Sequence, residues 1–120
     1  MAHRILVVED NELAAGALQA LFESFGYIVQ TADSVRAAIE ACASERTDLM
    51  LLDLTLPDGD GLSVLSAVAP LGRLPATTVA LTGHDDPDIT RRCLAAGCRE
   101  VLLKPVGARD LLARTAAWLA

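Results

Sequence analysis

The stretch LMLLDLTLPDGDG, residues 49–61, contains four consecutive apolar residues that lead into Asp53 and a loop rich in proline and glycine. A short apolar run that ends at turn residues is typical of a strand buried on both faces. Runs of the same kind cover residues 5–8, 78–81 and 101–103, and a weaker strand with looser alternation covers residues 27–31. The sequence therefore predicts four fully buried strands and one strand nearer a sheet edge.

Apolar residues recur at intervals of three and four in the gaps between these strands, and this spacing predicts an amphipathic helix in each gap. The third helix covers about residues 62–68. The predicted inward-facing residues of the other four helices are Leu18, Leu21, Phe22 and Phe25; Val35, Ala38, Ile39 and Cys42; Ile89, Cys93 and Ala96; and Leu112, Ala116 and Leu119.

Helix boundary residues support this assignment. Asp33 or Ser34 can cap the second helix, Asp86 followed by Pro87 begins the fourth, and Gly97 suits a left-handed cap at its end. Strands that alternate with helices at this spacing predict right-handed βαβ units. We therefore expect an α/β fold, a doubly wound parallel sheet of five strands in three layers, with residues 1–120 as one domain.

The composition excludes several classes of function. The formal net charge of −6 and the pI near 4.7 argue against direct binding to nucleic acid, which requires a basic face. Cys42, Cys93 and Cys98 are an odd set without paired spacing, so we expect reduced, buried thiols. No apolar run is long enough to cross a bilayer, and the chain is expected to be cytoplasmic and not bound to a membrane.

Polar residues follow four of the five predicted strands. They are Glu9 and Asp10 after the first, Asp53 after the third, Thr82 after the fourth and Lys104 after the fifth. The carboxyl ends of parallel strands meet at one edge of the sheet, where ligands of open α/β sheets bind. Three carboxylates at one site repel one another, and Lys104 neutralises only part of their charge. A bound Mg²⁺ ion would neutralise more of it.

These residue types suit phosphoryl transfer. An ionised aspartate is a competent nucleophile towards phosphorus, and Asp53 is the best placed candidate. The reaction depends mainly on in-line positioning and on cancelling the charge of the phosphoryl oxygens. A metal ion, the Lys104 ammonium and the Thr82 hydroxyl would fill these roles.

Other polar residues have simpler interpretations. Asp58 and Asp60 stand in the loop DGDG, residues 58–61, which lacks the spacing of a calcium site, so turn chemistry is the stronger interpretation and no metal role is assigned. His84 is expected to be an exposed loop residue. Leu13 and Ala14, near the predicted site, either dock a kinase or phosphotransfer helix or are partly buried in the core.

Four segments carry a resemblance to a known family: VVEDN at residues 7–11, LDLTLPDGDG at 52–61, ALTG at 80–83 and LKP at 103–105. Each is short, but each falls at the end of its own predicted strand, and together they span nearly the whole chain. In their order and spacing they resemble the receiver domains of two-component response regulators. The resemblance implies a flavodoxin-like fold with strand order 2-1-3-4-5 and five helices.

The resemblance also implies roles for individual residues. Asp53 would be the phosphoacceptor, and Asp10, Asp53 and the Thr55 carbonyl would bind Mg²⁺ directly. Glu9 would act on the metal through water. Lys104 would bind the phosphoryl group, and its peptide bond to Pro105 would be cis.

The sequence departs from the family pattern at two positions. Val101 stands where many receivers have a tyrosine or phenylalanine that moves when the threonine hydroxyl turns towards the phosphate. Gly83 follows Thr82 where alanine is commoner. Both departures concern the output of the domain more than its phosphorylation.

The expected function is that of a phosphorelay receiver, which takes a phosphoryl group from a histidine kinase or a histidine phosphotransfer protein. Such a chain is a phosphoacceptor that catalyses its own phosphorylation and dephosphorylation, as a monomer or weak homodimer. A haloacid-dehalogenase-like phosphatase is an alternative, but its nucleophile stands in Asp-x-Asp on an early strand, whereas position 55 is Thr. A pseudo-receiver that binds partners without phosphorylation is a second alternative.

Overall fold

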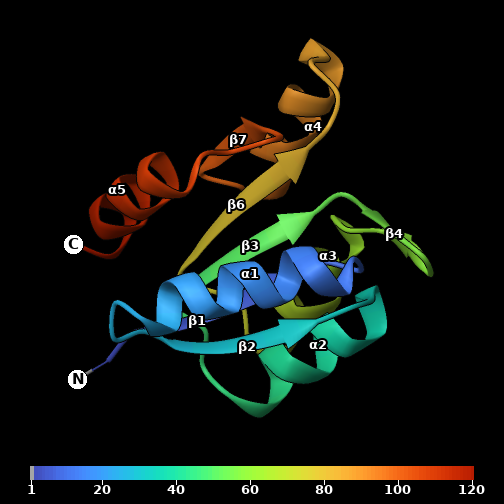
Figure 1. Cartoon of the computed structure of the whole chain (residues 1–120). Helices are drawn as coiled ribbons and strands as arrows, with labels where there is room; N and C mark the ends of the chain where they lie inside the picture. The colour runs from blue at the N-terminus through green and yellow to red at the C-terminus, as the bar shows by residue number, and fades with distance from the viewer. Residues whose placement is uncertain (1) are drawn as a thin grey trace.

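The computed structural model describes residues 2–120 as a five-stranded parallel sheet between two layers of helices (Figure 1). The elements, in chain order, are β1 (Arg4–Val8), α1 (Glu12–Glu23), β2 (Ile28–Ala32), α2 (Val35–Ser44), β3 (Leu49–Asp53), β4 (Thr55–Leu56), β5 (Gly59–Asp60), α3 (Ser63–Val68), η1 (Ala69–Leu71), β6 (Thr77–Thr82), α4 (Pro87–Ala96), β7 (Glu100–Leu103) and α5 (Ala108–Leu119). The large sheet has the order β2-β1-β3-β6-β7. This confirms the order 2-1-3-4-5, because β4 and β5 form a separate hairpin.

Successive residues of each central strand face opposite sides of the sheet, which gives the domain two apolar cores. Ile5 and Val7 of β1 join the core on one side, and Leu6 and Val8 join the core on the other. The same alternation continues along β3 and β6. This is why these strands are continuous apolar runs instead of alternating apolar and polar residues.

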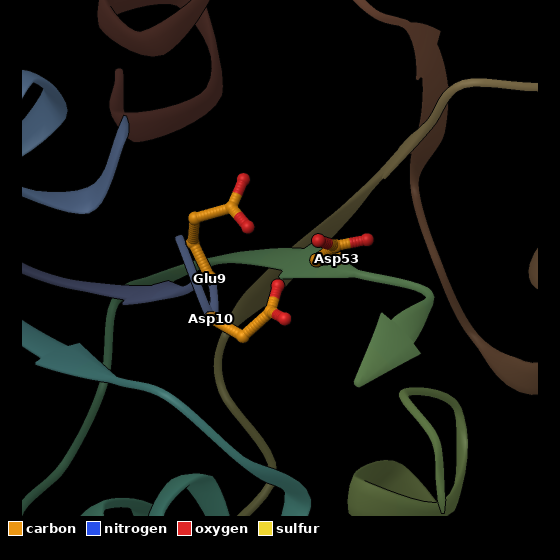
Figure 2. Close-up of side chains that lie close together, drawn as sticks. All are labelled: Glu9, Asp10 and Asp53. Atoms are coloured by element: carbon orange, nitrogen blue, oxygen red, sulfur yellow. The ribbon is translucent and has the colours of Figure 1, made fainter. Parts of the chain in front are cut away.

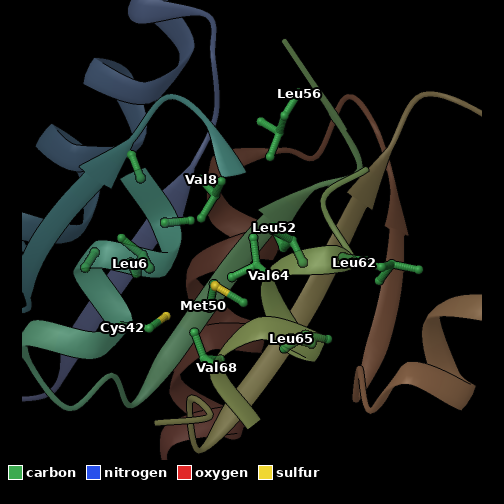
Figure 3. Packing of buried hydrophobic residues seen from close by; sticks show 14 of the residues in the cluster. Leu6, Val8, Cys42, Met50, Leu52, Leu56, Leu62, Val64, Leu65 and Val68 are labelled. Carbon is green, nitrogen blue, oxygen red and sulfur yellow. The ribbon is translucent and has the colours of Figure 1, made fainter. Parts of the chain in front are cut away.

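Helices α1 and α5 cover one face of the sheet, with Phe22, Leu111 and Trp118 as their largest buried side chains. Helices α2, α3 and α4 cover the other face, whose packing Figure 3 shows. Burial of an aliphatic side chain contributes about 1.5–3 kcal/mol. Both faces of the sheet are therefore strongly stabilised, and the strand ends are held in fixed positions.

The predicted helix boundaries are confirmed at α2 and α4. Ser34, not Asp33, caps α2, since its hydroxyl accepts the Ala37 N–H at 3.0 Å. Asp86 caps α4, and Gly97 ends it in the left-handed region at φ 108°. Both N-caps satisfy backbone N–H groups that would otherwise lack partners.

The predicted inward stripe of the last helix is confirmed in part: Leu112 and Leu119 are half-buried and pack against the core, but the most buried positions of α5 lie one residue earlier. The side chains of α5 that are buried are those of Leu111, Thr115 and Trp118, whereas Ala116 is exposed. The apolar pattern selects aliphatic residues, but the buried face of the helix also includes Thr115 and Trp118. The Trp118 Nε1 donates to Glu100 Oε1 at 3.1 Å, which fixes the rotation of the helix.

Three other expectations of burial are wrong. Phe25 is 63% exposed because α1 ends at Glu23, before the end of the apolar pattern. Ala96 is exposed in the last turn of α4. Leu103 is 49% exposed because β7 is an edge strand, so residues 101–103 are not a fully buried strand. In contrast, Cys42, Cys93 and Cys98 are free, buried thiols, as expected.

Candidate functional site

Glu9 and Asp10 form the connection between β1 and α1. The Glu9 N–H donates to the Ala32 carbonyl at 2.9 Å, which extends the pairing of β1 with β2 by one residue. Asn11 caps α1 by accepting the Ala14 N–H at 2.9 Å, and its own N–H donates to Glu9 Oε2 at 3.3 Å. The strand and the helix cap thus hold Glu9 buried at the sheet edge, while Asp10 is exposed beside it.

Asp53 is the last residue of β3, the central strand, and is 8% exposed. Its Oδ1 accepts the Thr55 N–H at 3.1 Å. One carboxylate oxygen from each of Glu9, Asp10 and Asp53 lies within 4.8 Å of the others. Figure 2 shows the three side chains at the ends of β1 and β3. The structure therefore brings together the acidic residues that the sequence placed on two separate strands.

Lys104 reaches these carboxylates from the end of β7. Its Nζ lies 3.0 Å from Glu9 Oε1 and 3.2 Å from Asp53 Oδ2. Burial opposes the ammonium charge, but the hydrogen bonds and negative charges of Glu9 and Asp53 outweigh this effect, and the pKa of Lys104 is raised. Lys104 is therefore a permanent cation at neutral pH.

The backbone around Lys104 agrees with the family pattern. Its peptide bond to Pro105 is cis, as the resemblance implied. The Lys104 N–H donates to the Thr82 carbonyl at 2.7 Å, so the ends of β6 and β7 are tied together. Thr82 is buried, and its Oγ1 accepts the His84 N–H at 3.1 Å. His84 itself is exposed, as expected.

A cavity of about 550 Å³ opens over these groups. Its lining includes Glu9, Asp10, Asp53, Thr55, Thr82 and Lys104, which are all the site residues expected from the sequence. Three carboxylates and one ammonium give it a formal charge of −2. The clustered side chains that could bind a metal, those of Glu9, Asp10 and Asp53, offer oxygen atoms, the ligands that Mg²⁺ prefers. The residues present therefore fit this ion.

Thr55 begins the short hairpin of β4 and β5, where the sequence predicts only a loop. Its register pairs Thr55 with Asp60 and Leu56 with Gly59. Thr55 is exposed at the rim of the cavity. Pairing within the hairpin therefore fixes the backbone of Thr55 in space beside Asp53.

Gly61 is a residue of the site that the sequence prediction missed. Its N–H donates to the Leu54 carbonyl at 2.9 Å, so the chain returns to the end of β3. A Cβ atom at position 61 would lie 2.2 Å from the backbone oxygen of Asp53. Only glycine permits this approach. The pair of glycines in residues 59–61 signals a tight turn, but it does not show which strand the turn would touch.

Asp58 and Asp60 have structural roles that the turn interpretation did not include. Asp58 accepts the N–H groups of Val35 and Arg36 at 2.8 and 3.0 Å, and these bonds lower the pKa of its carboxyl group. Asp60 accepts the Leu62 N–H at 2.9 Å and forms an ion pair with Arg92 of α4. The hairpin beside Asp53 is thus held to three helices.

Comparisons with known proteins agree with this geometry. The sequence model of the response regulator receiver domain matches residues 5–116. The response regulator MprA of Mycolicibacterium vanbaalenii is 36% identical over 120 residues, which cover 99% of this chain and 51% of that protein. The sensor histidine kinase AruS of Pseudomonas aeruginosa is 36% identical over 113 residues, which cover 92% of this chain and 11% of that protein. The chain therefore spans about half of one relative and about a tenth of the other.

Solved structures show the same fold. A CheY-like response regulator receiver domain protein of Methanospirillum hungatei superposes with a TM-score of 0.90 at 28% identity, over 99% of this chain and 94% of that one. The receiver domain of a sensor histidine kinase of Pseudomonas aeruginosa superposes with a TM-score of 0.84 at 27% identity, over 99% and 98% of the chains. That structure is described with a magnesium ion coordinated in its active site cleft.

The sequence predicts that no segment crosses a membrane, and the structure allows this to be checked for the helices. Among residues 2–120, no helix has the length and apolar character needed to span a bilayer.

The family match over most of the chain, together with relatives more than 30% identical over nine tenths of it or more, excludes the dehalogenase-like alternative. The chain belongs to the response regulator receiver domain family of two-component signalling.

Proposed function

We propose that Asp53 accepts a phosphoryl group from a phosphohistidine of a sensor kinase or phosphotransfer protein, in a reaction that requires Mg²⁺. One observation carries the proposal: the buried Asp53 carboxylate stands at the end of the central strand, 3.2 Å from Lys104 and within 4.8 Å of the Glu9 and Asp10 oxygens. This combination of nucleophile, cation and metal ligands comes from three different strand ends.

In the proposed step, an oxygen of Asp53 attacks the phosphorus atom. A bond forms between this oxygen and phosphorus, and the bond between phosphorus and the imidazole nitrogen of the donor breaks. The electron pair of the broken bond stays on that nitrogen, and the donor leaves as a neutral imidazole because its other ring nitrogen carries a proton. Because Asp53 is fixed at a strand end and by its bond to the Thr55 N–H, its carboxylate loses little further freedom in the reaction.

Lys104 and Thr82 are proposed to bind the transferred group. Lys104 is a permanent cation beside Asp53, and its ammonium can pair with a phosphoryl oxygen. The Thr82 hydroxyl lines the same cavity and can donate a hydrogen bond to a second oxygen. Both groups would stabilise negative charge that increases around phosphorus in the transition state.

Glu9, Asp10, Asp53 and the Thr55 carbonyl are proposed to hold the metal, with Glu9 acting through water. When bound, Mg²⁺ supplies the positive charge that the cavity lacks and stabilises the phosphoryl oxygens. The chain would then return to its starting state by hydrolysis of the aspartyl phosphate. It acts as a phosphoacceptor that catalyses its own phosphorylation and dephosphorylation, without turning over a separate substrate.

The experiment that tests this proposal is phosphorylation by acetyl phosphate in MgCl₂, followed by intact-mass measurement. The native chain should gain one acid-labile phosphoryl group, and the Asp53→Asn variant should gain none. Asp85→Asn is the matched control, since Asp85 is an exposed acidic residue in the loop after β6 and should leave the gain unchanged. An equal gain in Asp53→Asn would refute the site, and no gain in the native chain would favour a pseudo-receiver.

The donor is proposed to dock beside Leu13, at the start of α1. Leu13 is 87% exposed, so the alternative that it is buried in the core is wrong, while Ala14 is half-buried. Ala14 lines the cavity over Asp53. Leu13→Asp should slow transfer from a phosphorylated phosphotransfer protein but not from acetyl phosphate. Unchanged transfer from the protein donor would contradict docking at this residue.

A further inference from the structure

The opposite edge of the sheet, at the amino ends of the strands, carries a concentration of arginines in an acidic protein. Four of the ten lysine and arginine residues lie at this edge. Arg4 is the first residue of β1, and the other three stand in the segments that lead into β3, β6 and β7, namely Arg46, Arg73 and Arg99. Within residues 2–120, none of these four side chains forms an ion pair. A chain with a formal net charge of −6 is not expected to gather arginines without ion-pair partners at one edge of its sheet.

Two of these arginines share a small cavity. Arg46 and Thr47, before β3, line it together with Gly72, Arg73 and Leu74, before β6. Its volume is about 60 Å³. A cavity needs roughly 10–15 Å³ of such volume to hold one water molecule, so this cavity has room for a small polyatomic ion.

The loops that carry the two arginines are fixed by backbone hydrogen bonds. The Ala76 N–H donates to the Thr47 carbonyl at 3.0 Å, and the Arg73 N–H donates to the Val68 carbonyl at 3.2 Å. Gly72 stands in the left-handed region at φ 66°, and open space lies where its side chain would be. The backbone positions from which Arg46 and Arg73 extend are therefore fixed, so the two loops need not rearrange when a ligand binds.

The acidic residues beside Arg46 in the chain form no ion pair with the arginines of this cavity. Asp48 directs its carboxylate to the backbone N–H of Arg4, at 2.7 Å. Neither Asp48 nor Glu45 lies within ion-pair distance of the guanidinium groups of Arg46 or Arg73. The carboxylates of the phosphorylation site are a strand length away, about 17 Å, and salt screens charges over about 8 Å.

We infer that Arg46 and Arg73 form a binding site for a phosphate dianion. Two guanidinium groups match the charge of a phosphate monoester or of inorganic phosphate near neutral pH, which is about −1.5 to −2. Arginine binds phosphate through paired N–H groups, more specifically than lysine does. The site is separate from Asp53 and does not depend on the function proposed for it.

The test is titration of the ¹⁵N-labelled chain with inorganic phosphate, at constant ionic strength and with EDTA to exclude metal. The amide signals of Thr47, Gly72 and Leu74 should shift and saturate. Arg46→Gln or Arg73→Gln should weaken binding about tenfold, because a charge-assisted hydrogen bond contributes about 1.5–3 kcal/mol. Arg109→Gln, at an exposed arginine of α5, is the matched control and should retain the native affinity.

Two further ligands separate the possible sources of the phosphate. O-phosphoserine that binds at least as tightly as inorganic phosphate would assign the site to a phosphorylated side chain, and weaker binding would assign it to free phosphate. Acetate, a planar monoanion, should bind at least tenfold more weakly. Equal shifts with acetate or with chloride, or unchanged shifts in Arg73→Gln, would overturn the inference.

Discussion

The two edges of the sheet are built from the same strands but differ in how their charges are held. At the carboxyl edge, Glu9 and Asp53 are buried and each forms an ion pair with the half-buried Lys104. At the amino edge, Arg46 and Arg73 are exposed and have no ion-pair partner within residues 2–120. The charged side chains at the carboxyl edge are held in ion pairs, whereas the two arginines at the amino edge can bind a ligand.

The difference follows from the connections at each edge. At the carboxyl edge, the chain passes from β1 to α1 through a short connection, and the hairpin after β3 turns back onto Asp53 through Gly61. These connections hold polar side chains close together over the strand ends. Substituting residues at the carboxyl edge should therefore affect both stability and phosphorylation, while substitution at the amino edge should affect neither strongly.

The largest effect is expected for Gly61→Ala. The added Cβ would lie 2.2 Å from the Asp53 carbonyl oxygen, so the hairpin must move away from the site. Overpacking of this kind costs about 1–3 kcal/mol, and phosphorylation by acetyl phosphate should slow. Urea unfolding and intact-mass time courses measure the two effects. The control is Gly16→Ala in α1, where space is open and alanine should stabilise by about 0.5–1 kcal/mol. Similar stability of the two variants would contradict a fixed carboxyl edge.

The next effect is expected for Lys104→Met. Lys104 pairs with the carboxylates that a bound metal ion would also neutralise, so the variant should be less stable without Mg²⁺ and should bind Mg²⁺ more tightly. Calorimetric titration with MgCl₂ and urea unfolding in EDTA provide the measurements. An unchanged affinity for Mg²⁺ would show that the ammonium does not compete with the metal.

Lys104 also predicts a pH dependence. Its pKa is raised in the folded chain, so the contribution of its ion pairs to stability is complete below the ordinary lysine pKa. This contribution is lost as pH rises through the higher folded-state pKa. The stability of the native chain in EDTA should therefore decline above about pH 10, and that of Lys104→Met should decline less. Parallel curves of stability against pH would contradict the assignment.

A smaller effect is expected for Asp58→Asn, which keeps one acceptor for the backbone of α2 and removes the charge. The pKa of Asp58 is lowered by the N–H groups of Val35 and Arg36. Its contribution to stability is therefore present above the ordinary aspartate pKa and is lost as pH falls through the lower folded value. Urea unfolding at neutral and acidic pH should show the variant less stable near neutrality and the difference shrinking in acid. A difference independent of pH would point to hydrogen-bond geometry alone.

The smallest effect on stability and phosphorylation is expected for Arg73→Gln. An exposed side chain without an ion pair contributes within about 0.5 kcal/mol, so unfolding and phosphorylation at Asp53 should match those of the native chain. A loss of either would mean that the two edges are coupled. The anion affinity described above is the property that this substitution should change.

Sequence periodicity was sufficient to predict most strands and helices. It did not predict which residues are buried where burial does not follow hydrophobicity. Each central strand contains a continuous apolar run because both of its faces are covered, and this pattern is readable without a structure. The inward face of α5 includes Thr115, which an apolar pattern does not select. Leu103 and Phe25 are apolar but exposed, because the sheet ends at β7 and α1 ends before Phe25.

The sequence by itself determined the doubly wound fold and the residues of the acidic site, because parallel strands bring their carboxyl ends to one edge whatever the details of packing. Only the tertiary structure decided the contacts made by Asp58 and Gly61, and the meeting of Arg46 with Arg73 at one cavity. These contacts join residues from different loops. Local sequence patterns fix the positions of neighbours along a strand or helix, but the distance between two loops depends on how the whole sheet packs.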